Sequence, residues 1–328
     1  MTKQRLPYID IAKGILILLM IWYHTSPAID RNIEGCNPMI GGIGYNTRIW
    51  FECFFMPAFF IINGNCSRFA EDRKTFYIKL LKTIVLPTCA FRFLLPLIFD
   101  LSFNPLRLIG FFKPQSGQWF MTALVVARVL VYEAKHIIHN KWTLGAAFLL
   151  LTIFATIGKE ISAIPNWYYW PQGLCAALFI WIGHVLRDYE ITNKSLAIGS
   201  LVYLLAIVGV NLCGIHRPVM VVSLAVNWYE VPLFMLLSVT GTALIVYISK
   251  QLKSRMLEYI GRNSLVMYFV QWSALVWLAK HLSQYIDVAT ESGCFVMAVT
   301  IYILSIVISL VFVKLTDTKY GRYLTGKF

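Results

Sequence analysis

The chain has 328 residues, of which 58% are hydrophobic and 14% are charged, and its mean hydropathy is +0.66. Soluble domains carry about 25% charged residues and shorter apolar runs, so the composition excludes an ordinary soluble protein. The formal net charge of +13 does not indicate a nucleic-acid partner, because the lysines and arginines collect at the ends of apolar runs, where they set membrane topology.

The apolar runs predict an all-α, polytopic membrane helix bundle embedded in a lipid bilayer. They recur from one end of the chain to the other, so residues 1–328 are interpreted as a single membrane domain with no soluble domain appended. The first run is too long for the core of a signal peptide and is expected to remain as a span. About ten transmembrane helices are predicted, at residues 7–27, 47–66, 76–99, 118–134, 142–158, 171–187, 195–213, 232–250, 257–279 and 293–314.

The distribution of basic residues predicts the orientation of these spans. With ten spans, roughly three quarters of the lysines and arginines fall on the side of the N-terminus. Both termini are therefore predicted to be cytoplasmic, in a multi-pass protein of a bacterial cytoplasmic (inner) membrane. The apolar run 218–231 is short for a span, and counting it as one would move Lys250, Lys253 and Arg255 outside. We predict that it is an outward-facing re-entrant segment or loop.

The first span carries three ionisable residues, Asp10, Lys13 and His24. Such groups are costly in hydrocarbon, so they are expected to face the bundle interior or a hydrated cavity. Lys13 and His24 are eleven residues apart, which places them on one helix face, about 20° and roughly 16 Å from each other. Asp10 lies one turn before Lys13, close enough to pair with it. This polar stripe is the strongest functional signal in the sequence.

The stripe has a functional and a structural interpretation. His24 is the natural proton acceptor, because an unperturbed imidazole titrates near neutrality, but a histidine that only hydrogen-bonds a neighbouring helix has the same sequence pattern. Lys13 lies near the predicted cytoplasmic boundary, where a lysine that snorkels to the interface is the alternative to a functional residue. A transporter or flippase is the rival class, although its usual pair of broken helices in two repeats is not evident.

Further polar residues lie within or beside the later spans. Lys79 and Lys82 share one face at the start of the third span and follow Arg68. They either anchor the topology or bind the phosphates of a polyanionic donor at a cytoplasmic mouth. Arg92 lies within a span, with Glu52 as a candidate partner, either in a structural pair or in a substrate cavity.

The remaining polar residues have weaker assignments. Asn63 either ends the second helix or lines the cavity. His184 and Gln271 are more typical of structural hydrogen bonding than of catalysis. The seven cysteines show no metal-ligand spacing, so we expect no metal or redox centre.

Several motifs follow the order found in a known family. In the first span Asp10 precedes Lys13, and His24 follows; the second span reads Phe-Phe-Met-Pro-Ala-Phe-Phe over residues 54–60 and then Asn63-Gly64. Later motifs are Lys79 and Lys82 before Pro87, Trp119-Phe120-Met121, and Gly261-Arg262-Asn263-Ser264-Leu265. From residue 5 to about 275 the chain thus resembles integral-membrane acyltransferase family 3, and most closely its fucose 4-O-acetylase-like branch. The family's ten spans and cytoplasmic N-terminus agree with the count above.

The resemblance has two departures. Phe55 stands where this branch usually has a second histidine, and Gln271 stands where the late span often has a histidine before Trp272. Both departures bear on the choice of acceptor, whereas the first-span residues Lys13 and His24 match the family pattern.

The resemblance implies transfer of an acyl group, usually acetyl, from cytoplasmic acyl-CoA to a hydroxyl of a cell-surface or lipid-linked glycan. A peptide, lipid or antibiotic is the alternative acceptor. His24 is expected to act as general base, together with the catalytic candidates Asp10 and Asn63. Acetyl-CoA is expected as the donor substrate, without a metal, and its binding is assigned to Lys13, Lys79, Lys82, Arg68, Trp119 and Asn263. Neither the acceptor nor the oligomeric state is predicted.

Overall fold

The computed structural model describes residues 6–30, 33, 47–67, 69–100, 119–159, 169–222, 224–318 and 321–325. Within these ranges the regular structure is helical, apart from one antiparallel bridge between Val219 and Ala225. The helices are α1 (Pro7–Asp30), α3 (Phe55–Cys66), α4 (Arg73–Leu80), η1 (Leu81–Val85), α5 (Leu86–Phe99), α7 (Trp119–Ile137), α8 (Lys141–Gly158), α9 (Trp170–Leu186), α10 (Asn193–Leu212), η4 (Trp228–Glu230), α11 (Val231–Gln251), α12 (Arg255–Arg262), α13 (Ser264–Leu282), α14 (Glu291–Thr316) and α15 (Gly321–Leu324).

Each of the ten predicted spans overlaps a helix or a run of consecutive helices. Among the described residues, seven segments are long and apolar enough to cross a membrane, by length and composition, and α3 and α9 are shorter apolar helices. The predicted fold class, a polytopic helical membrane protein, is therefore confirmed. The number of crossings and the side of the termini stay predictions.

Three of the predicted spans are not single helices of the expected length. The second is shorter, because residues 49–54 form turns and α3 begins only at Phe55. The third consists of α4, the π-helical turn η1 and α5 in direct succession. Pro87 accounts for the π-turn, because it lacks the N–H that would bond the carbonyl of Thr83 in a regular α-helix. The ninth is interrupted at Asn263, between α12 and α13.

The apolar run 218–231 is not a helical span in its described part. It contains the bridge between Val219 and Ala225, the left-handed residue Leu224 (φ 46°) and the single 3-10 turn η4. Gln172 at the start of α9 holds this segment, because its Nε2 donates a hydrogen bond to the carbonyl of Val222 at 2.5 Å. The prediction that this run does not form an additional transmembrane helix agrees with the structure.

The chain forms two compact units, each built from segments that are distant in sequence. The first, here called the α1 unit, comprises residues 1–51, 86–108 and 252–328. The second, the α9 unit, comprises residues 52–85 and 109–251.

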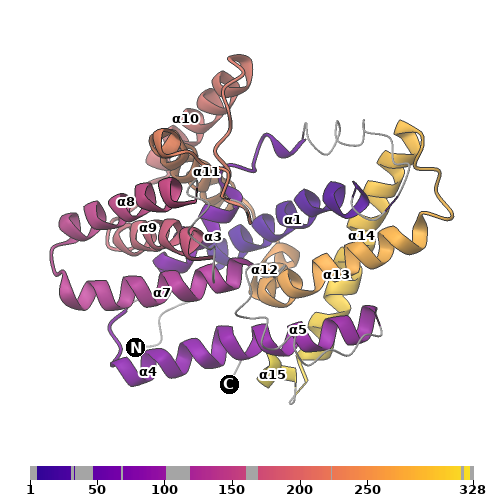
Figure 1. The fold of residues 1–328 in the computed structure, drawn as a ribbon, viewed down its shortest axis with the longest axis horizontal. Helices are drawn as coiled ribbons and strands as arrows, with labels where there is room; N and C mark the ends of the chain where they lie inside the picture. Colours follow the sequence, from indigo (N-terminus) through magenta and orange to yellow (C-terminus); the bar gives the residue numbers. More distant parts are fainter. Residues whose placement is uncertain are drawn as a thin grey trace. The chain divides into compact units, whose positions relative to one another are not determined.

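In the α1 unit, α1 packs against α12, α13 and α14, and α14 lies across α13 (Figure 1). Two glycines allow α1 and α12 to approach closely. A Cβ at Gly14 would lie 2.3 Å from the carbonyl oxygen of Leu257, and a Cβ at Gly261 would lie 1.7 Å from that of Asp10. Small residues permit such backbone contact in a bilayer, where helices associate by close packing rather than by the hydrophobic effect.

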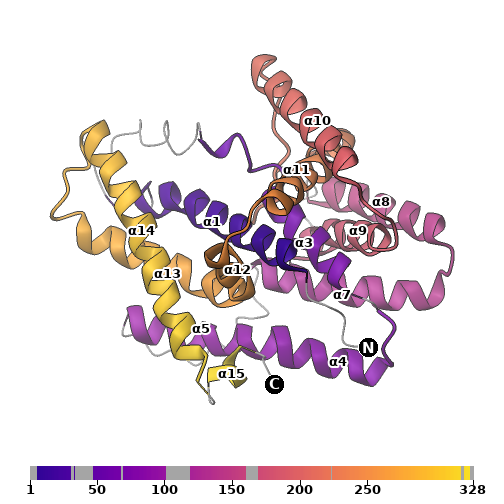
Figure 2. The ribbon, with the colours of Figure 1, turned by 180° about the vertical axis from the view of Figure 1, so that it is seen from behind.

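In the α9 unit, α9 contacts α3, α7 and α8, while α10 and α11 form a pair (Figure 2). The crossing of α3 and α9 again depends on glycine, this time on both helices. A Cβ at Gly64 would lie 2.0 Å from the carbonyl oxygen of Ile180, and one at Gly183 would lie 1.9 Å from that of Ile61. Gly64 of the second-span motif is therefore required by helix packing.

Candidate active site

His24 of α1 lies beside α13 within the α1 unit. Its Nδ1 is 3.2 Å from Oε1 of Gln271, which is only 2% exposed. The rings of His24 and Trp272 meet edge to face with their centroids 5.6 Å apart. Gln271, one of the two residues at which the sequence departs from the family pattern, is thus the hydrogen-bond partner of the predicted base.

The contact with Gln271 has a consequence for the protonation of His24. An amide oxygen only accepts hydrogen bonds. Nδ1 of the neutral imidazole therefore carries the proton, and its N–H group donates a hydrogen bond to Oε1. Nε2 then carries the lone pair that a general base requires. Gln271 therefore orients the ring and fixes the tautomer suited to proton abstraction at Nε2.

Asp10, at the other end of the stripe, contacts α12. Its buried carboxylate lies 3.6 Å from Nε of Arg262, and the same guanidinium also bonds Glu258 one turn earlier on α12. A buried carboxylate needs such a partner, because an unpaired charge in an apolar interior is strongly unfavourable. The sequence predicted Lys13 as the neighbour of Asp10 and gave Arg262 no role in the site.

The two remaining candidates of the α1 unit occupy different environments. Lys13 is half-buried in the first half of α1. Asn263 is 5% exposed, and its Nδ2 donates a hydrogen bond to the carbonyl of Tyr259 at 2.9 Å. This bond satisfies a carbonyl at the end of α12, so Asn263 shapes the break between α12 and α13.

The other predicted site residues belong to the α9 unit, except for Arg68, which lies outside the described residues. Trp119 is buried at the start of α7, and Lys82 is exposed within the π-turn η1. Lys79 is bonded to Glu71, with 2.5 Å between Nζ and Oε1. Asn63 accepts a hydrogen bond at Oδ1 from Nη1 of Arg128, at 3.3 Å.

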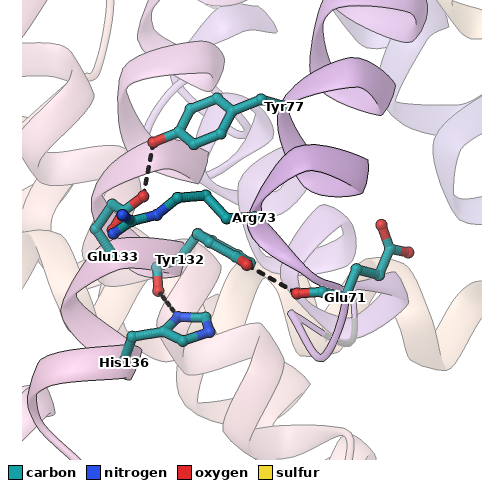
Figure 3. A network of polar contacts seen from close by, with 6 residues as sticks. All are labelled: Glu71, Arg73, Tyr77, Tyr132, Glu133 and His136. Carbon is teal, nitrogen blue, oxygen red and sulfur yellow. Dashed lines mark hydrogen bonds and ion pairs between the residues drawn. The ribbon is translucent and has the colours of Figure 1, made fainter.

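A polar network joins the start of α4 to the end of α7 (Figure 3). Glu133 accepts hydrogen bonds from Arg73 and from the hydroxyl of Tyr77, the latter at 2.7 Å. The hydroxyl of Tyr132 donates to the carbonyl of Glu71, also at 2.7 Å. Both helix ends are predicted to face the cytoplasm, and their direct contact is consistent with that assignment.

Asp72 caps the start of α4, outside the apolar part of the helix. Its Oδ1 accepts a hydrogen bond from the backbone N–H of Thr75 at 2.9 Å. Hydrogen bonds from Thr75 lower the pKa of the Asp72 carboxyl, because they favour its ionised form. The cap therefore stays charged at neutral pH, and a negative charge at a helix start is favourable.

His184 and Glu52 have structural partners within the α9 unit. His184 lies between the carbonyl oxygen of Ser67 and the ammonium group of Lys135, each 3.1 Å from one ring nitrogen. Glu52 accepts a hydrogen bond from Nε of Arg217 at 2.9 Å. Both arrangements agree with the structural interpretation of these residues, and Glu52 has a partner that the sequence did not predict.

The sequence did not single out three arginines that matter in these contacts. Arg128 was given no role and Arg262 appeared only as part of the late-span motif, although the first binds Asn63 and the second binds Asp10. Arg73 of the Figure 3 network was given no role either. The available signal was the presence of Arg128 ten residues into an apolar helix, since a charge there needs a partner.

The helices define a multi-pass membrane protein in which a histidine and a carboxylate are held between apolar helices. The family model of acyltransferase family 3, described as an acyltransferase domain, matches residues 6–314. The chain belongs to acyltransferase family 3, and it is therefore a membrane acyltransferase. No curated protein and no solved structure matches the chain significantly.

Proposed function

We propose that this acyltransferase transfers an acetyl group from cytoplasmic acetyl-CoA to a hydroxyl of a cell-surface or lipid-linked glycan, as in the fucose 4-O-acetylase-like branch. The proposal is supported chiefly by the hydrogen bond between Nδ1 of His24 and Oε1 of Gln271. This bond leaves the lone pair of the imidazole on Nε2, in a helix whose motif is that of the family.

The proposed reaction needs one proton acceptor and no metal. Nε2 of His24 takes the proton of the acceptor hydroxyl while the oxygen attacks the carbonyl carbon of the thioester. The tetrahedral intermediate collapses, the carbon–sulfur bond breaks, and the sulfur leaves as the thiol of CoA after it receives the proton from the imidazolium. General-base help of this kind is worth about 10² to 10⁴ in rate.

Asp10 supports this chemistry indirectly. Its ion pair with Arg262 joins the first turn of α1 to α12, which precedes the helix that carries Gln271. We therefore assign Asp10 a positioning role rather than a direct role in proton transfer.

The donor end of the proposed site contains the cations on the predicted cytoplasmic side. Lys13, Lys79 and Lys82 are proposed to bind the phosphates of CoA, since ammonium groups pair well with phosphate. Lys79 must then exchange its contact with Glu71 for the ligand. Arg128 engages Oδ1 of Asn63, so the Nδ2 group of this residue is the donor that we propose for the oxyanion.

The proposal is tested by following the acetyl group. Membranes that contain the protein are incubated with radiolabelled acetyl-CoA, and the glycan fraction is analysed by mass spectrometry for added acetyl groups. We expect acetylated glycan with the wild-type protein and none with membranes that lack it. Label that enters a peptide or a free lipid instead would contradict the glycan acceptor, and no transfer at all would contradict the reaction.

A further inference from the structure

Three cations lie on the second half of α7 and just after α9, beside the last residues of α3, in the α9 unit. They are Arg128 and Lys135 of α7 and Arg187, which follows α9; we call them the cation cluster. Each contacts α3 or the turn after it, either directly or through His184. None of them was given a functional role by the sequence, and none belongs to the His24 site.

Arg128 is the most deeply placed member of the cluster. Its Nη1 donates to Oδ1 of Asn63 at 3.3 Å, and its Cζ lies 5.7 Å from the centre of the Phe69 ring. Its Nε is buried and has no hydrogen-bond partner among the described residues. A buried charged donor without an acceptor is costly, so this guanidinium has the capacity for an additional anionic partner.

The other two cations lie close to Ser67, the residue that follows α3. Nη1 of Arg187 donates to the carbonyl oxygen of Ser67 at 2.8 Å, and Nδ1 of His184 donates to the same oxygen at 3.1 Å. Because Nδ1 of His184 is the donor, Nε2 accepts from the ammonium group of Lys135, 3.1 Å away. His184 is therefore the neutral partner of Lys135 in this contact.

The local balance of charge favours an anion. The described hydrogen bonds of the cluster include one carboxylate, that of Asp188, which bonds Nε of Arg187 at 3.1 Å and has a 65% exposed side chain. Glu71 interacts electrostatically with Arg128 and is also paired with Lys79. Counting Lys79, four cations share two carboxylates in the described contacts, which is an excess of positive charge beside apolar helices.

We infer that the cation cluster binds phosphate groups of the nucleotide end of the acyl-CoA donor. A guanidinium presents two parallel donors to phosphate, and an ammonium adds a point charge. Arg128 and Lys135 are seven residues apart, on one face of α7 and about 10 Å from each other, so they would meet different phosphate groups of one ligand. The inference deepens the proposed function, on which it rests for the identity of the donor.

The test measures nucleotide binding without requiring transfer. The full-length protein is placed in nanodiscs of zwitterionic lipid, and binding of adenosine 3′,5′-bisphosphate is measured by calorimetry. We expect Arg128→Met to weaken binding at least about tenfold, the loss of one charge-assisted pair. Arg128→Lys keeps the positive charge but loses the two parallel donors of the guanidinium. It should therefore weaken nucleotide binding by a smaller factor than Arg128→Met.

Lys194→Met is the matched control, because it removes one positive charge from an exposed residue in the first turn of α10. It should leave binding within about twofold of wild type. Equal weakening by Lys194→Met and Arg128→Met would overturn the inference, since it would indicate unspecific attraction. Failure of the wild-type protein to bind the probe would overturn it as well.

The phosphate of a lipid headgroup could occupy the cation cluster through the same contacts as a nucleotide phosphate. A second series of nanodiscs therefore contains phosphatidylglycerol. If Arg128→Met changes retention of this lipid and not binding of the nucleotide, the cluster is a lipid site and the inference is wrong. Should Arg128→Met fail to fold, as judged by size-exclusion chromatography, Arg187→Gln provides the same comparison at a half-buried, more accessible position.

The nucleotide-binding test of the cation cluster can be distinguished from the acetyl-transfer test of the proposed function. His24→Ala should abolish acetyl transfer and leave nucleotide binding intact, because His24 is not part of the cluster. A protein that binds the nucleotide through Arg128 but never transfers an acetyl group would contradict the proposed function alone.

Discussion

At the scale of single residues, the central feature is a histidine whose tautomer is set by a neighbouring amide. Gln271 Oε1 can accept a hydrogen bond but cannot donate one, so Nδ1 of His24 holds the proton. A histidine at position 271 would keep this arrangement if its unprotonated nitrogen faced Nδ1. The departure from the family pattern at this position therefore preserves the function of orienting His24.

This argument predicts the effect of changing Gln271. Gln271→Leu removes the acceptor at similar volume, and we expect kcat for acetyl transfer to fall about tenfold, which corresponds to one hydrogen bond of about 1.4 kcal/mol. The KM for acetyl-CoA should stay unchanged, since Gln271 is not assigned to donor binding. Gln271→His, which can still accept, should retain most of the activity. Equal loss in both variants would contradict a role through the acceptor atom.

The sequence predicted only part of this arrangement. The spacing of Asp10, Lys13 and His24 was sufficient to identify the polar stripe, because helical periodicity is a local property. It did not predict that Asp10 pairs with Arg262 or that Arg128 binds Asn63. Those contacts depend on which helices cross and at what height, and neither quantity is encoded within a single span.

At the scale of helices, glycine sets the closest contacts. Gly261 allows the backbone of α12 to contact the backbone of α1 at Asp10. Gly183 and Gly64 allow the backbones of α9 and α3 to contact each other. The apolar runs predicted the helices well, because run length follows bilayer thickness. The π-turn before Pro87 and the break at Asn263 were not predicted, since both are local departures within an otherwise apolar run.

The glycine contacts give a prediction for stability. Gly261→Ala would place a methyl group 1.7 Å from the carbonyl oxygen of Asp10, so α1 and α12 must separate. We expect a loss of about 2 kcal/mol in the free energy of unfolding, within the range for overpacking, and a lower thermal midpoint in detergent. Acyl transfer should also fall, because the separation displaces Asp10 from Arg262.

Gly209→Ala in α10 is the control for this substitution. A Cβ at Gly209 meets no described atom within 4 Å. The better helix propensity of alanine should leave stability unchanged or raise it by up to about 1 kcal/mol. A similar loss of stability in both variants would show that the effect does not arise from the contact with Asp10.

At the scale of the whole molecule, each of the two compact units contains its own set of polar groups. The α1 unit holds His24, Gln271 and the ion pair of Asp10, whereas the α9 unit holds the cation cluster and the network of Figure 3. The family match extends over segments of both units.

The predicted orientation can be checked with two native cysteines. Cys66 ends α3 and Cys213 follows α10, and both are exposed. Variants that keep one of these residues, with the other six cysteines replaced by alanine, are treated with a membrane-impermeant maleimide. Cys213 should react in intact spheroplasts, whereas Cys66 should react only after permeabilisation. The reverse pattern would mean that the predicted topology is inverted.

The most direct test of the proposed mechanism is the rate of acetyl transfer by His24→Ala in purified, reconstituted form. The variant should keep the thermal midpoint and nucleotide binding of the wild-type protein, because His24 is only half-buried and its partner Gln271 remains in place. We predict that kcat falls by about 10² to 10⁴, the usual contribution of a general base. Wild-type turnover in a folded His24→Ala protein would contradict the assignment of His24 as the base.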